Sequence, residues 1–113
     1  MSTETQRKDP VEAIIKALRD YLRDRGHMLF SLASSESIAR IALRGLWRRH
    51  DISTGYVKLM DAVREAKRSE EHMKRLREYG ILGFEVFDGE LYAVVDLRKL
   101  RELWRRASRP STR

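Results

Sequence analysis

The feature that most constrains the fold of this 113-residue chain is a change of hydrophobic period at Ile81. Before this point apolar residues recur every three or four positions, as on a helix, and after it they alternate, as on a strand. Asp88-Gly89 divides the alternating stretch and is typical of a two-residue type I′ turn, in which both central residues need positive φ. The sequence therefore predicts a hairpin, with Phe87 opposite Glu90, that packs on helices. This register places three apolar pairs on one face: Val86 with Leu91, Phe84 with Ala93 and Leu82 with Val95.

A first helix is predicted over residues 9 to 25. Asp9 is a suitable N-cap, Pro10 fits the first helical position, and Glu12 stands where a capping carboxylate bonds back. Gly26 supplies a stop signal. One buried stripe is expected along this helix, formed by Val11, Ile14, Ile15, Leu18 and Leu22.

A strand and a second helix are predicted after Gly26. Residues 27 to 32 form a short apolar stretch suited to an edge strand. Ser34 and Ser35 then offer an N-cap for a helix over residues 35 to 50. In this helix the apolar residues would bury one side, and the arginines would lie on or near the other.

The remaining helices are predicted on both sides of the hairpin. Residues 54 to 79 form either one long helix or two, the second capped by Ser69, and Gly80 ends both versions. A closing helix over residues 97 to 107 follows the hairpin. We therefore expect a mainly α chain with a C-terminal β-hairpin, which is an α+β fold.

Size and composition predict a single domain over residues 9 to 107, between a flexible tail at 1 to 8 and a basic tail at 108 to 113. Hydrophobic residues make up 42% of the chain and charged residues 36%, which argues against disorder. No apolar run is long enough for a membrane span, and there is no cysteine for a disulfide. A cytoplasmic location is expected.

The charge is strongly basic and unevenly spread. The chain has 24 basic and 17 acidic residues, a net charge of +7. Residues 97 to 113 carry +6 of this net charge, because they include seven basic side chains and a single acidic one, Glu102. A basic surface gains free energy by displacing counterions from nucleic acid, so the charge indicates a nucleic-acid partner.

Basic residues at helical spacing are the candidate DNA contacts. Arg40, Arg44 and Arg48 are four apart, a spacing suited to following a row of phosphates, and Arg49 stands beside them. The other candidates lie further along the chain and are Lys58, Lys67, Arg68, Lys74, Arg75, Arg77, Arg105 and Arg106. Carboxylates within a turn, such as Glu70 and Glu71, could pair with some of them.

One segment, residues 73 to 82, resembles the winged helix-turn-helix family. Met73 and Leu76, three apart, precede Gly80 and an apolar strand, and Asp88-Gly89 and Tyr92 follow, as at the end of that family's recognition helix and its wing. The resemblance implies a winged helix-turn-helix with extra terminal helices that places a helix from residues 54 to 79 in the DNA major groove. It also implies a homodimer through the closing helix, with Leu97, Leu100, Leu103 and Trp104 at the interface. The alternative is that these side chains pack on the first helix of the same chain.

The sequence leaves alternatives to a DNA-binding transcriptional regulator or architectural factor associated with the nucleoid. The acidic wing tip favours a winged helix that acts as a protein-interaction adaptor, and Trp47 together with the basic tail would permit RNA binding. His27, His50 and His72 are far apart and have no ligand spacing, so no metal or cofactor is expected. No nucleophile or phosphate-loop motif occurs, and an enzyme is not expected.

Overall fold

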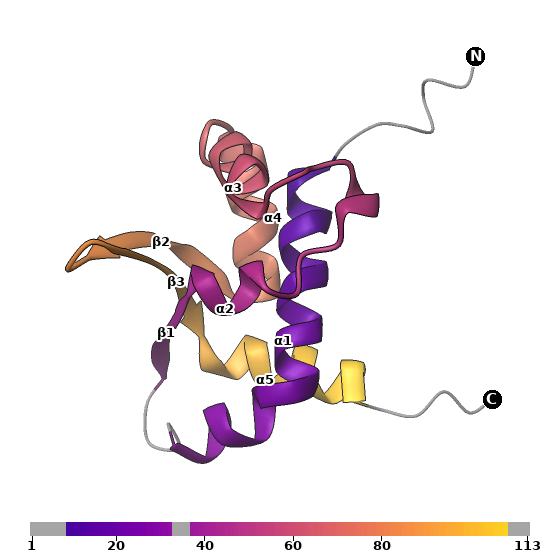
Figure 1. Cartoon of the computed structure of the whole chain (residues 1–113). Coiled ribbons are helices and arrows are strands. Elements are labelled where there is room, and N and C mark those ends of the chain that lie inside the picture. The colour runs from indigo at the N-terminus through magenta and orange to yellow at the C-terminus, as the bar shows by residue number, and fades with distance from the viewer. Residues whose placement is uncertain (1–8, 33–36, 109–113) are drawn as a thin grey trace.

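The protein is a mixed α+β chain in a computed structural model that describes residues 9–32 and 37–108 (Figure 1). The described residues form five α-helices and one three-stranded antiparallel sheet. The elements in chain order are α1 (Pro10–Leu32), β1 (Ile38–Ala42), α2 (Leu43–Trp47), the 3-10 turn η2 (Ile52–Thr54), α3 (Leu59–Lys67), α4 (Glu70–Tyr79), β2 (Ile81–Phe87), β3 (Glu90–Asp96) and α5 (Leu97–Ser108). The hairpin is therefore not C-terminal, since α5 follows it.

Helix α1 is the centre of the fold and contacts each of the other four helices (Figure 1). It begins at Pro10, as predicted, because Asp9 caps it and accepts a 3.0 Å hydrogen bond from the Val11 N–H. The predicted apolar stripe is buried, and these side chains form the middle of the core. Burying five such side chains is the main favourable term in placing α1.

The predicted end of the first helix at Gly26 is wrong, as is the strand over residues 27 to 32. Helix α1 continues to Leu32, and Gly26 is buried within it, six residues before its end. A Cβ on Gly26 would lie 2.4 Å from Trp104 Nε1, so the missing side chain makes room for the α5 indole ring. That ring also packs against Phe30, with 5.0 Å between ring centroids. Glycine here serves close helix packing and does not end the helix.

The predicted helix over residues 35 to 50 is also wrong. Residues 38–42 form β1, and of the described residues in this range only Leu43–Trp47 are α-helical, while the proposed caps at 34 and 35 lie outside the described residues. β1 pairs antiparallel with β3, which puts Ile41 opposite Ala93 in the core and Arg40 opposite Val94 on the outer face. Pairing with a distant strand outweighs the local helical pattern. Arg40, Arg44 and Arg48 therefore do not form one helical row.

The region from 54 to 79 forms two helices, α3 and α4. The Ser69 hydroxyl accepts a hydrogen bond from the His72 N–H at 3.3 Å and so caps α4, as the two-helix alternative requires. Gly80 ends α4 with φ of 111°, a left-handed conformation that favours glycine.

The hairpin forms with the predicted turn and most of the predicted register. Phe87 lies opposite Glu90, and Asp88 and Gly89 both have positive φ. The predicted Leu82 pairing is wrong, because a bulge near Leu82 places Ile81 opposite Val95. The sheet order is β1-β3-β2, so β2 is an edge strand. The tip of the hairpin projects away from the helices (Figure 1), which leaves Val86 and Phe87 about 70% and 67% exposed.

Candidate nucleic-acid interface

The arginines of β1 and α2 are matched by carboxylates of the hairpin. Arg40 Nε lies 3.0 Å from Glu85 Oε1, across β3 on the outer face of the sheet. Arg44 makes two hydrogen bonds to the carboxylate of Glu90, one of them 3.1 Å from Nε to Oε2. The hairpin, residues 81–96, carries four acidic side chains, one of them in the turn, and no basic one. Two predicted DNA contacts thus have their charge neutralised within the chain.

Arg49 and Arg48 are adjacent in sequence but differ in exposure and in their contacts. Arg49 donates to Asp24 at 3.2 Å and to the Gly45 carbonyl at 2.9 Å, and its guanidinium lies over the Tyr21 ring. Its side chain is only 19% exposed. Arg48 is exposed and has no ion pair with any described residue. Only Arg48 of the two is available to a phosphate.

Helix α4 has a balanced outward surface. It carries three acidic and three basic side chains. Arg77 pairs with Glu70 at 2.7 Å, and Arg75 makes two hydrogen bonds to Asp9. Lys74 is exposed and has no ion pair among the described residues. The recognition surface expected from the sequence is therefore close to neutral.

The Asp9–Arg75 pair joins the start of α1 to α4. Partial burial raises the pKa of Asp9, but the hydrogen bond and charge of Arg75 and the α1 backbone N–H groups outweigh this and hold its pKa below the ordinary 3.8. The same hydrogen bond raises the pKa of Arg75. Arg75 therefore serves the packing of α4 on α1.

Three further predicted contacts are exposed but scattered. Lys58 precedes α3, and Lys67 and Arg68 stand at its end. None of them makes an ion pair with another residue in the described part of the chain. They can add charge to a nucleic-acid surface, but they do not form a continuous row with the α4 cations.

Helix α5 concentrates cations on one side. Leu97, Leu100 and Leu103 are buried, whereas the basic residues are all exposed. At 100° per residue the five basic side chains fall within an arc of about 160° opposite the apolar arc. We call this surface the α5 basic face, formed by Arg98, Lys99, Arg101, Arg105 and Arg106. With five basic side chains and one acidic, α5 has a net charge of +4.

The contacts of the α5 basic face leave its charge accessible. The only acidic side chain of α5, Glu102, lies 3.8 Å from Arg105 and 3.9 Å from Arg106, both long and exposed pairs. Arg101 stacks over Phe30 of α1 at 5.1 Å from the ring centroid, and Lys99 donates to the Arg77 carbonyl. From the sequence, Arg105 and Arg106 are the individual DNA contacts predicted in this helix, and the basic residues of 97 to 113 are expected to attract phosphate only as a group. The opposite arcs of leucine and arginine in 97–108 are the signal that identifies the rest of the face.

The residues predicted for a dimer interface lie inside one chain. Leu97, Leu100 and Leu103 are at most 5% exposed and belong to the core cluster. Trp104 packs against His27 and Phe30 of α1. These contacts hold α5 on α1, and a dimer through the same side chains would require α5 to leave α1.

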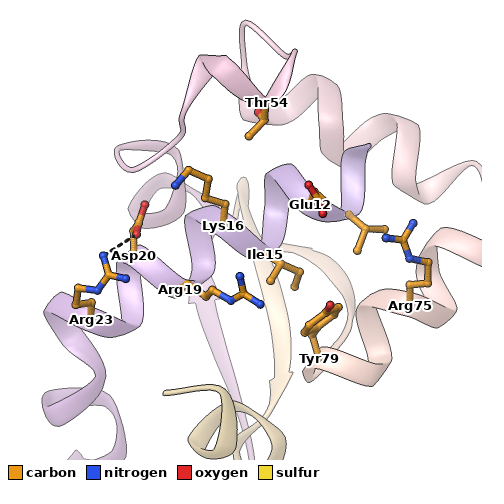
Figure 2. A pocket seen from close by; sticks show the side chains of 10 residues that line it. Glu12, Ile15, Lys16, Arg19, Asp20, Arg23, Thr54, Arg75 and Tyr79 are labelled. Carbon is orange, nitrogen blue, oxygen red and sulfur yellow. Dashed lines mark hydrogen bonds and ion pairs between the residues drawn. The ribbon is translucent and has the colours of Figure 1, made fainter. Parts of the chain in front are cut away.

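A hollow of about 270 Å³ lies between α1, the η2 turn and α4 (Figure 2). Its rim is charged, and most of its cations are already paired: Lys16 with Asp51, Arg23 with Asp20 and Arg75 with Asp9. Of the four cations that line it, Arg19 alone has no ion pair among the described residues. An anion would gain little electrostatic binding free energy from cations that are already paired, so the hollow is a poor anion site.

The described part of the chain contains no cluster of three or more potential metal-ligating side chains, and none of its helices is long and apolar enough to cross a membrane. Trp47 is about half exposed beside Arg48, as stacking on a base would require. No protein-family model, curated protein or solved structure matches the chain.

Proposed function

We propose that the chain binds duplex DNA through its backbone phosphates, with the α5 basic face as the principal contact. The observation that carries the proposal is the accessible net charge of +4 on α5, set against arginines elsewhere that are paired with carboxylates. Each phosphate that a basic side chain neutralises releases condensed counterions, which favours binding without sequence selectivity.

The arrangement of elements supports a winged-helix module as the scaffold of this function. A helix, a strand, further helices and a hairpin follow one another, and β1 pairs with β3 in a sheet of order β1-β3-β2. In this assignment α4 is the recognition helix and the β2–β3 hairpin is the wing. Because α4 is balanced in charge and the wing is acidic, the proposal assigns the affinity to α5.

The first test measures binding to a labelled random-sequence duplex at about 50 and 200 mM salt, where each neutralised phosphate contributes roughly 0.9 to the logarithmic salt slope. We expect binding to weaken at least about tenfold over this range. No binding at the lower salt concentration would overturn the proposal.

A pair of variants of equal charge locates the surface. The α5 variant carries Arg98→Gln, Arg105→Gln and Arg106→Gln. The matched control carries Arg48→Gln, Lys67→Gln and Arg68→Gln, at three exposed cations that make no ion pair among the described residues. Loss of three phosphate contacts should lower the salt slope of the α5 variant by up to about 2.7, and the control should change much less. Equal losses in both variants would assign binding to net charge and contradict a role specific to α5.

A second candidate function, a protein-interaction adaptor, is favoured by the hairpin. Its tip exposes Val86 and Phe87 among acidic residues, which suits an apolar contact better than a phosphate. The salt titration separates the two functions, because an adaptor would not bind the duplex at low salt.

A further inference from the structure

The basic residues of α5 form two rows, and Glu102 lies between them around the helix axis. Counted from Leu97 at about 100° per residue, the first row lies at about 40–100° and the second at about 180–200°. Glu102 stands at about 140°, near the crest of the helix opposite the apolar arc. The first row consists of Arg98, Arg101 and Arg105, and the second row consists of Lys99 and Arg106.

Contacts with the neighbouring helices place the two rows on opposite flanks of α5. On the first flank Arg101 stacks over Phe30 of α1, with its guanidinium carbon 5.1 Å from the ring centroid. On the second flank Lys99 Nζ donates to the Arg77 carbonyl of α4 at 3.3 Å. One row therefore borders α1 and the other borders α4, and the crest between them faces away from both helices.

Glu102 occupies the space between the rows. Its side chain is 57% exposed, and its two carboxylate oxygens lie 3.8 Å from Arg105 of the first row and 3.9 Å from Arg106 of the second. Pairs of this length between exposed side chains are weak, so the carboxylate can still accept a hydrogen bond from another donor. A carboxylate here opposes the binding of phosphates, and phosphate binding alone gives it no role.

We propose that α5 lies in the major groove of the duplex, with its two rows on the phosphates of the two strands and Glu102 directed at the base edges. The inference rests on the proposed function, because it specifies how the α5 basic face meets DNA. A helix with its side chains is about 10–12 Å across, and the major groove is about 12 Å wide. Cations on both flanks of the helix then reach both walls of the groove.

The charge of Glu102 selects the major groove over the minor groove. In the minor groove the base edges present acceptors, apart from the guanine amino group, and acceptors repel a carboxylate. The major groove presents two amino donors, on cytosine and on adenine. Adenine carries its N7 acceptor beside the amino group, whereas cytosine offers the N4 donor alone. Glu102 is therefore expected to accept a hydrogen bond from cytosine.

A duplex with a blocked major groove tests the placement of α5. Two duplexes of equal length are compared by fluorescence anisotropy at about 50 mM salt. One has ordinary cytosine, and in the other every cytosine carries a glucosylated 5-hydroxymethyl group, which is neutral and fills the major groove. The blocked duplex should bind at least about tenfold more weakly. Equal affinities would overturn this inference and leave phosphate binding intact, whereas no binding to either duplex would overturn the proposed function and this inference with it.

Substitution of Glu102 tests which side chain meets the base edges. Affinities are compared for a duplex of mixed A·T pairs and a duplex of equal length rich in C·G pairs. The unmodified chain should prefer the C·G duplex about fivefold, near the lower end of the discrimination that one base contact gives. Glu102→Gln should shift the preference towards the A·T duplex, because a glutamine amide pairs with adenine N6 and N7.

The matched control is Glu71→Gln, at an exposed α4 residue without an ion pair among the described residues. It removes the same charge and should keep the preference of the unmodified chain. No preference in the unmodified chain, or a preference that Glu102→Gln leaves unchanged, would overturn the inference.

Discussion

Two parts of the molecule have the same excess of positive charge and use it differently. Residues 38–58 contain five basic side chains and one acidic, and so does α5, so each carries a net charge of +4. In the first part the fold brings Glu85 and Glu90 of the hairpin against Arg40 of β1 and Arg44 of α2, and these charges cancel. In α5 the cations share one helical arc and have only Glu102 beside them. Tertiary structure therefore decides which cations can reach a phosphate.

The largest effect is expected when α5 is given the charge balance of the sheet region. Arg98→Glu with Arg105→Glu leaves α5 with three basic and three acidic side chains and lowers its net charge from +4 to 0. The variant loses two phosphate contacts and gains two carboxylates that repel the phosphates. Duplex affinity should therefore fall at least about a hundredfold at low salt, since each contact contributes through counterion release. Fluorescence anisotropy with a labelled duplex measures this. Affinity within threefold of the unmodified chain would show that α5 is not the contact.

The next effect concerns how α5 is held. Gly26→Ala should lower the free energy of unfolding by about 1 to 2 kcal/mol, because overpacking against Trp104 outweighs the gain of about 1 kcal/mol in helix propensity. Urea denaturation measures the change. In a Trp104→Ala background the same substitution should become stabilising, since the clash is gone. Destabilisation of equal size in both backgrounds would exclude the close contact as the cause.

Freeing the arginines of the sheet region should produce a moderate effect of the opposite sign. Glu85→Gln with Glu90→Gln leaves Arg40 and Arg44 without their carboxylates and should increase the salt slope by roughly 0.9 for each arginine that then reaches a phosphate. The control is Glu71→Gln with Glu78→Gln on α4, which makes the same change in net charge and frees no arginine from an ion pair among the described residues. An equal increase in the control would mean that total charge, and not the freed arginines, governs affinity.

The smallest effect is expected at the Asp9–Arg75 pair. Asp9→Asn retains a good N-cap but loses the ion pair, and since both side chains are partly exposed the cost should be about 0.5 to 1 kcal/mol at neutral pH. The folded pKa of Asp9 lies below 3.8, so its contribution is complete above that pH and is lost as the pH falls through the folded value. Thermal unfolding between about pH 2 and 7 should therefore show the two proteins converging in acid. A constant difference across this range would contradict the assignment.

The sequence predicts the elements that are set by local chemistry. The cap at Asp9, the cap at Ser69, the stop at Gly80 and the Asp88-Gly89 turn each depend on residues a few positions apart, and all of them form. Elements set by distant contacts were predicted wrongly. Gly26 has the residue type of a helix stop, and only the indole from α5, 78 positions later, gives it another role.

The candidate site shows the same difference between features set by neighbouring residues and features set by distant contacts. The apolar and basic arcs of α5 are visible in twelve consecutive residues, so this face could be found from sequence. The pairing of Arg40 with Glu85 could not, because the partners are 45 positions apart and the segment around Arg40 also fits a helical pattern. A strand and a short helix were therefore interpreted as one basic helix, and its arginines as DNA contacts.

The most direct test of the central claim is an NMR titration of the isotopically labelled chain with a short random-sequence duplex, followed through its backbone amide resonances. The α5 basic face predicts the largest shift changes at Arg98, Arg101 and Arg105 and at neighbouring residues of α1, with small changes in α4 and at the hairpin tip. Changes confined to α4 and the hairpin, with α5 unaffected, would contradict the account and return the contact to the helix and wing that the sequence resemblance implies.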